Sequence, residues 1–231
     1  MAKSKKSAKE VLKWKKKKWV KIVSPKDFGN VVLGESLVMK PETLVGKTIE
    51  VSLMSLKRDV KKQNVNVKFL ITNFTNNQAN TKLLSFKMIP SFIKRMIRRS
   101  KDRIDLSFVC QTKDNLTIRI KPLLITMNNT SNSVLTTLRK KAEFLITQYV
   151  KKNDYNKVMD DIINYRIQKE LKKQLKTIYP LRLVEIRIVQ LQKKDQLLSQ
   201  VNVDEIKSSP EDEKSNETDV KQTDNVKKEG V

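Results

Sequence analysis

Histidine is absent from this 231-residue chain, and cysteine occurs only once, at Cys110. Without histidine, the chain cannot build a Ser-His-Asp or Cys-His catalytic arrangement, and an ordinary zinc site lacks its ligands. A single cysteine excludes an internal disulfide and favours a reducing, cytoplasmic compartment. Because Cys110 lies in an apolar strand pattern, we expect its thiol to be buried and inert.

Glycine and long apolar runs are also scarce. None of the four glycines lies in a phosphate-binding loop or a dinucleotide fingerprint. No apolar run is long enough to span a bilayer, and none follows the charged N-terminus, so we expect neither a membrane span nor a secretory signal. Asp160 and Asp161 are helix neighbours that do not converge, which favours a solvated helix face over a metal or catalytic pair. The sequence therefore predicts no enzyme, no catalytic residue, no metal, no cofactor and no small-molecule substrate.

Basic residues, by contrast, are abundant: 49 Lys plus Arg face 25 Asp plus Glu, for a net charge of +24. The charge is uneven, with +10 over residues 1–26, −4 over residues 204–231 and the remaining +18 between them. A domain this basic repels itself, and a polyanion is the simplest compensating partner.

Composition divides the chain into three parts. We expect residues 1–18 to be a disordered basic RNA-binding arm, residues 19–194 a single domain, and residues 195–231 a disordered acidic tail. The region from 24 to 46, punctuated by proline and glycine, is predicted to be a long connection. Alternating apolar residues predict strands at 19–23, 47–53, 65–71, 81–87, 104–110 and 116–124, the last two forming a hairpin.

Helical periodicity appears at residues 90–100, with an apolar stripe and a basic side, and again after residue 130. The second region predicts three helices, with Asp154 as the N-cap of the middle one and Tyr179-Pro180 after the last. A final strand follows, with Val184, Ile186 and Ile188 on one face. Strands first, helices later and one closing strand predict the α+β class.

Four basic clusters supply the candidate RNA-binding residues. Lysines act as mobile point charges, whereas arginines offer planar forks that bind phosphates and stack on bases. The clusters are Lys13, Trp14, Lys15, Lys16, Lys17, Lys18, Trp19 and Lys21; Lys94, Arg95, Arg98, Arg99, Lys101 and Arg103; Arg139, Lys140 and Lys141; and Arg182 and Arg187.

Each cluster has an alternative interpretation as a solvated surface. For the cluster at 139–141 the two interpretations are equally weighted, because any amphipathic helix needs a polar side. For the helix at 90–100, RNA binding is favoured, since no acidic residue balances its cations. The indoles of Trp14 and Trp19 could stack on exposed bases. Alternatively, Trp19 opens the first strand and packs into the domain.

Several longer segments resemble a known family. They are "WVKIVSPKDFGNVVLGES", "KPETLVGKTIEVSL", "RRSKDRID", "TKDNLTIRI" and "KTIYPLRLVEIRIVQL", which occur in the family's order from about Trp14 to Gln192. They resemble archaeal members of the small-subunit ribosomal protein family e-S-one, formerly S-three-a-e, which archaea and eukaryotes share. Where the family usually has glycine, this chain has Ser100 and, in the hairpin turn, Asn115; asparagine tolerates the left-handed conformation that such a turn requires.

The resemblance implies a barrel-like, mostly antiparallel β domain with packed C-terminal helices. It also implies a structural, translation-supporting role on the platform of the small ribosomal subunit, near the mRNA exit and the rRNA 3′ end. The partners implied are small-subunit rRNA and neighbouring platform proteins, with the protein a monomer within the ribosome. A basic DNA-compacting or transcription-associated protein is the alternative, although no helix-turn-helix, zinc finger or basic zipper is present. A peripheral membrane protein fits less well, because the folded part is basic far from the arm.

Overall fold

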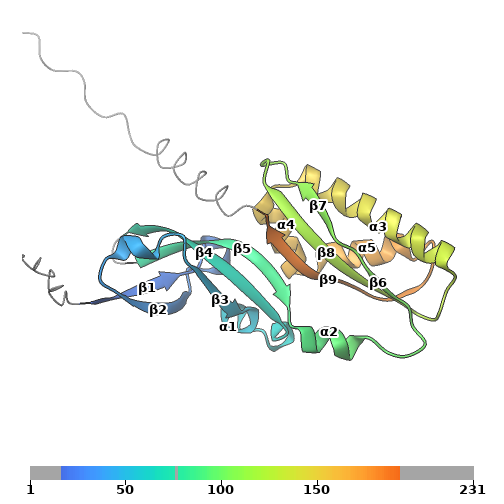
Figure 1. The fold of residues 1–231 in the computed structure, drawn as a ribbon, viewed down its shortest axis with the longest axis horizontal. Coiled ribbons are helices and arrows are strands. Elements are labelled where there is room, and N and C mark those ends of the chain that lie inside the picture. Colours follow the sequence, from blue (N-terminus) through green and yellow to red (C-terminus); the bar gives the residue numbers. More distant parts are fainter. Residues whose placement is uncertain (1–16, 76–77, 193–231) are drawn as a thin grey trace, which may run out of the picture.

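The computed structural model describes residues 17–75 and 78–192, and the fold within them is α+β, as predicted (Figure 1). Lys13, Trp14, Lys15 and Lys16 of the predicted arm, and the whole predicted tail at 195–231, lie outside these residues. The strands are β1 (Lys18–Val23), β2 (Val32–Val38), β3 (Thr48–Ser52), β4 (Val65–Thr75), β5 (Gln78–Met88), β6 (Arg103–Asp105), β7 (Phe108–Gln111), β8 (Thr117–Thr126) and β9 (Leu181–Leu191). The helices are α1 (Leu53–Lys57), α2 (Pro90–Met96), α3 (Asn132–Lys152), α4 (Tyr155–Ile163) and α5 (Arg166–Leu175), with 3₁₀ turns η1 (Lys26–Phe28), η2 (Pro41–Leu44) and η3 (Val60–Lys62).

The strands form one mostly antiparallel sheet in the order β2-β1-β5-β9-β8-β6, with β4 and then β3 following from the other edge of β5. The first five strands curl around a small apolar core that includes Val20, Ile22 and Ile71. β3 comes close to β2, since a Cβ atom added at Gly34 of β2 would lie 3.5 Å from the Cδ1 of Ile49 in β3. No hydrogen-bond ladder joins these two described strands, however. The sheet is therefore barrel-like in its curl but does not close.

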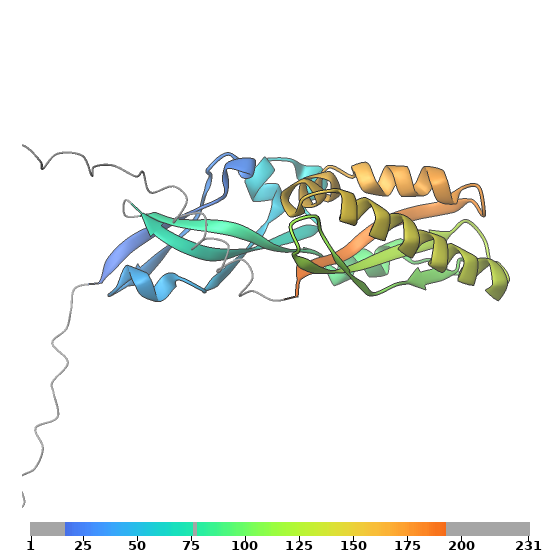
Figure 2. The ribbon, with the colours of Figure 1, turned by 90° about the horizontal axis from the view of Figure 1, so that it is seen from above.

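The half that contains β8 and β9 has three layers, because alternate residues of the strands face opposite sides. Ile118, Ile120 and Leu124 of β8 belong to the main core, which α3, α4 and α5 cover. Leu123 and Ile125 point the other way and pack with the helix α2. Figure 2 shows the long helices α3 and α5 along one side of the sheet.

Tyr155, at the start of α4, ties the helical layer to the sheet. Its buried hydroxyl lies 3.1 Å from the carbonyl oxygen of Leu83 and 3.2 Å from that of Leu84, both in β5. Its backbone N–H donates to the Asp114 carboxylate at 2.9 Å, so the β7–β8 turn also holds this helix end. Asp154 occupies the predicted N-cap position, but its side chain makes no capping hydrogen bond, since Asp114 supplies the acceptor.

Some sequence expectations were wrong in detail. The predicted connection at 24–46 contains the strand β2, and the single strand predicted at 104–110 is divided into β6 and β7. Ile188 does not share a face with Val184 and Ile186, because Arg187 forms a bulge: Ile186 pairs with Pro122 and Ile188 with Lys121. The turn prediction at Asn115 is confirmed, with a left-handed φ of 59°, and Ser100 has a φ of 61°.

Candidate nucleic-acid interface

One face of the central sheet carries basic side chains that none of the described helices covers. Strand pairing places Lys68 opposite Ser85, Ser85 opposite Gln190, and Gln190 opposite Arg119, so these side chains form a row across four strands. Two residues along, Lys87 pairs with Ile188, which pairs with Lys121, so a second row runs beside the first. We call the surface formed by Lys68, Lys87, Arg119 and Lys121 the open face.

The open face spans the width of several strands. With neighbouring strands ~4.8 Å apart, Lys68 and Arg119 are separated by about 14 Å and Lys87 and Lys121 by about 10 Å. Lys87 is exposed and the other three are half-buried. Such side chains lay their apolar stems along the sheet and keep their charged ends in water.

Few acidic groups balance the open face. Within the described residues, none of its four cations makes an ion pair of 4.0 Å or less with a carboxylate. Glu50 of β3 lies opposite Lys68 at the rim, where it accepts a hydrogen bond of 3.1 Å from the Asn66 side-chain amide. Because cations held close together repel one another, this surface is favourable for a polyanion.

The helix α2 borders the open face and adds further cations. Its apolar residue Ile93 packs on Met88, Leu123 and Ile125, which fixes the helix on the same side of the sheet. A hollow beside the helix has an apolar floor that includes Ile97 and Ile188. Its basic lining residues come from four segments: Lys87, Lys94, Arg103 and Arg187.

Asp105 organises the two arginines of this hollow. Its carboxylate lies 2.6 Å from an Nη of Arg103 and 3.6 Å from an Nη of Arg187. The Nε of Arg187 is buried and has no hydrogen-bond partner among the described residues. One carboxylate therefore orients two guanidinium groups without neutralising both.

Two members of the second predicted cluster, Lys94 and Arg103, line this hollow. Lys94, Arg95, Arg98 and Arg99 are all exposed, but α2 ends at Met96, so the last two arginines lie in the following loop rather than on the helix as predicted. Arg95 also donates to the Asn64 side chain at 3.3 Å and lies over the Phe92 ring. Lys101 donates to the carbonyl oxygen of Met127.

The described residues of the first cluster lie on β1. Lys17, Lys18, Trp19 and Lys21 are exposed, and Trp19 retains 63% of its accessible surface. Its cross-strand neighbour Leu37 is also exposed. The alternative in which Trp19 packs into the domain is therefore wrong, and its indole is free to contact a partner.

The third cluster is not brought to the open face. Arg139 and Lys140 are exposed and Lys141 is half-buried on α3, which packs on the opposite side of the sheet. The fourth cluster is also divided. Arg187 lies by α2, whereas Arg182 lies at the start of β9, where its carbonyl oxygen accepts a hydrogen bond of 2.9 Å from Lys172 of α5.

Sequence reasoning missed all four residues of the open face. Each of these cations alternates with buried apolar residues in a strand, so it forms no run in the sequence. The available signal was the alternation itself, since several basic residues occupied the polar positions of neighbouring strands.

Two expectations about reactive residues can be tested directly. Cys110 is buried as predicted, and burial raises the pKa of its thiol to about 11. The solvated face predicted for the adjacent aspartates is wrong for Asp161, which is 4% exposed. Asp161 accepts a hydrogen bond from the Tyr149 hydroxyl and pairs with Arg166 at 3.2 Å. Among residues 17–75 and 78–192, no group of three or more acidic or cysteine side chains is arranged to bind a metal ion.

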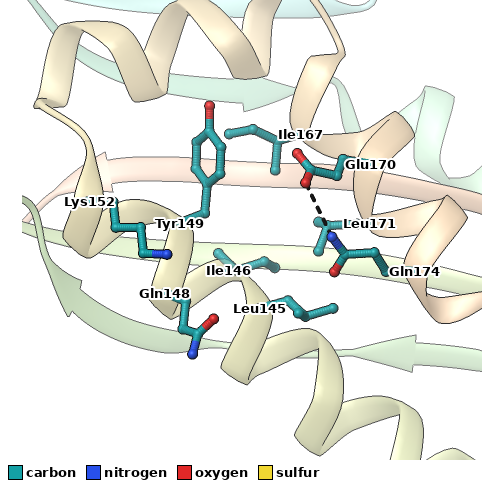
Figure 3. A pocket seen from close by; sticks show the side chains of 9 residues that line it. All are labelled: Leu145, Ile146, Gln148, Tyr149, Lys152, Ile167, Glu170, Leu171 and Gln174. Carbon is teal, nitrogen blue, oxygen red and sulfur yellow. Dashed lines mark hydrogen bonds between the residues drawn. The ribbon is translucent and has the colours of Figure 1, made fainter.

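The helical side offers a groove of a different character. Figure 3 shows side chains of α3 and α5 around it, including Leu145, Tyr149, Ile167 and Leu171. At the edge of the groove, Glu170 accepts a hydrogen bond of 3.2 Å from Gln174. Lys152 is the only basic residue among the described residues that line the groove. This groove therefore lacks the positive charge of the opposite face.

Fold and surface together define a basic α+β protein whose charged sheet face suits a polyanion better than a small substrate. Residues 4–195 match the Ribosomal S3Ae family. Three archaeal relatives, each named small ribosomal subunit protein eS1, are similar to the chain. The protein of Methanothermobacter thermautotrophicus is 31% identical over 75% of this chain and 89% of its own length. The protein of Methanospirillum hungatei is 32% identical over 80% of this chain and 94% of its own length. The protein of Nanoarchaeum equitans is 34% identical over 72% of this chain and 84% of its own length.

The chain therefore belongs to the Ribosomal S3Ae family, and the predicted family is confirmed. This membership supports a structural role in the small ribosomal subunit. Across the part of the chain that the structure describes, no helix has the length and apolar character to cross a membrane.

Proposed function

We propose that this protein is a structural constituent of the small ribosomal subunit and binds small-subunit rRNA with the open face and the neighbouring α2 cations. The observation that carries the proposal is the open face itself: four cations in two rows, with no ion-paired carboxylate among the described residues. The family's relatives, named as small-subunit proteins, support the same partner. The proposal assigns no catalytic step and no cofactor.

The mechanism is electrostatic and geometric. Lysines and arginines on a rigid sheet neutralise phosphates and release condensed counterions, which provides affinity without reading sequence. The sheet fixes the positions of these charges, so a bound rRNA segment is held in one shape. In this proposal the arm at 1–18 and Trp19 add contacts beyond the open face, and residues 19–194 act as one domain. In this proposal, which the family resemblance supports, the site lies on the platform near the mRNA exit and the rRNA 3′ end, and the protein is a monomer beside other platform proteins.

The test replaces the four cations of the open face with glutamine and measures binding to a small-subunit rRNA transcript across a salt series. If each cation neutralises one phosphate, the negative slope of log affinity against log salt should become less steep by about 3. The matched control removes the same charge from α3 by replacing Arg139, Lys140, Lys141 and Lys151 with glutamine.

We expect the α3 variant to keep most of the natural affinity and salt slope. Equal losses in the two variants would indicate that only total charge matters and would remove the open face from the mechanism. Equal affinity for a DNA duplex of the same length would instead favour the DNA-compacting alternative. Circular dichroism of both variants establishes that the fold is retained.

A further inference from the structure

The acidic C-terminal segment carries a charge pattern complementary to the open face. Residues 211–219 contain five carboxylates, Glu211, Asp212, Glu213, Glu217 and Asp219, and a single lysine, for a net charge of −4. The open face carries four cations, none of them ion-paired among the described residues, and Glu50 lies at its rim. The family match ends at residue 195, so this segment lies beyond it.

The place where the chain leaves the fold brings the two together. β9 ends at Leu191, and the next residue, Gln192, lines a hollow together with Lys68, Ser85 and Lys87. The described chain therefore ends at the edge of the open face. From there, 18 residues precede Glu211.

Length does not limit the contact. A chain of that many residues spans about 60 Å when extended, whereas the open face is about 14 Å across. Because the segment and the face belong to one molecule, their effective concentration is in the millimolar range. Weak multivalent ion pairing is enough to populate a bound state under those conditions.

The basic arm is another intramolecular cation source, and its position distinguishes it from the open face. β1, which follows the arm, pairs with the beginning of β5 at Gln78, whereas β9 pairs with the far end of β5 at Lys87. Figures 1 and 2 both show β1 starting at one end of the molecule and β9 ending near its middle.

We propose that residues 211–219 dock on the open face of the same chain and compete with RNA for it. The segment acts as an electrostatic cover, which RNA displaces when its phosphates outnumber the segment's carboxylates. The docking stands on the geometry and charge given above, whereas the competition rests on the proposed RNA-binding function. Salt weakens both contacts, since the Debye length is about 10 Å at 0.1 M.

Zero-length carbodiimide coupling of the full chain, without RNA at low salt, tests the docking. This reagent joins a carboxylate to a lysine amine only where the two groups touch. We expect links within one chain from residues 211–219 to Lys68, Lys87 and Lys121. The exposed α3 lysines Lys140 and Lys151 are internal controls on the opposite side. Links that are equally frequent to α3, or that concentrate on the arm, would overturn the docking.

RNA binding by two full-length variants tests the competition. Replacing the five carboxylates with their amides should raise rRNA affinity about five- to tenfold at low salt, with the gain disappearing at high salt. Replacing Lys214 with glutamate makes the segment more acidic, and it should lower the affinity and increase the coupling to the open face. An unchanged affinity in the amide variant overturns the competition. If the natural chain still couples to the open face when the amide variant shows no gain, the docking stands and RNA uses another surface. A failure of the proposed RNA-binding function can thus be distinguished from a failure of the docking.

Discussion

Replacing Glu185 with glutamine is expected to stabilise the protein at high pH far more than at low pH. Glu185 lies on β9 opposite Leu123, which is completely buried. One oxygen of its carboxylate is buried and has no hydrogen-bond partner among the described residues. Burial raises the pKa of Glu185 from an ordinary 4.5 to about 7, because the charged form is poorly solvated there.

The sign of the effect follows from proton binding. Between these two pKa values the folded state keeps a proton that the unfolded state has released, so the free energy of unfolding falls as pH rises. The stability that protonated Glu185 contributes to the fold is fully present below the pKa that this group has in the unfolded chain. It is lost as the pH rises through the folded pKa of about 7. At about 1.4 kcal/mol for each pKa unit, the total loss is about 3 kcal/mol.

Urea unfolding, followed by circular dichroism near pH 5 and near pH 8.5, measures this difference. The glutamine variant cannot ionise, so its stability relative to the natural protein should rise by about 2.5 kcal/mol between the two conditions. Glu143→Gln on the exposed surface of α3 is the matched control and should show little change with pH. An equal effect of Glu185→Gln at both pH values would refute the argument, because it would mean that the carboxyl is as well solvated in the fold as in water.

Two further predictions concern buried groups. Tyr155→Phe should lower the free energy of unfolding by about 1–2 kcal/mol in urea titrations, because the hydroxyl no longer donates to the β5 carbonyls. An unchanged stability would mean that this hydroxyl does not anchor α4. Cys110 should resist an aromatic disulfide reagent at pH 8 in the native protein and react fully in denaturant, since the buried thiol has a pKa of about 11. Rapid labelling of the native protein would contradict the burial.

Much of the fold follows from local pattern. Alternation located β3, β4, β5, β8 and β9, and the three- and four-residue steps located α3, α4 and α5. The strand β2 was missed because Gly34 interrupts it and because Val38 is its only buried residue, so little alternation is visible. The predicted strand at 104–110 failed for a different reason, since β6 and β7 pair with separate segments of β8.

The candidate site was less accessible to sequence reasoning, because clustering along the chain is a poor guide to clustering on a sheet. Arg139, Lys140 and Lys141 are consecutive, yet they lie on the helical side of the molecule. Lys68 and Arg119 are 51 positions apart in the sequence, yet strand pairing places them in one row. Only strand order and register convert such distant positions into a surface, and neither can be read from a single sequence.

The limits of the open face follow from where the alternation of β8 and β9 changes. Up to Lys121, β8 presents apolar residues to one side and cations to the other, so one face stays in water. From Pro122 onward both sides are apolar, and the second side requires a cover, which α2 supplies through Ile93. The bulge at Arg187 lies at this transition and turns Ile188 to the floor of the hollow beside α2. The same few residues therefore determine where the helix packs and where the basic surface begins, so a shift of this bulge should change the core and the interface together.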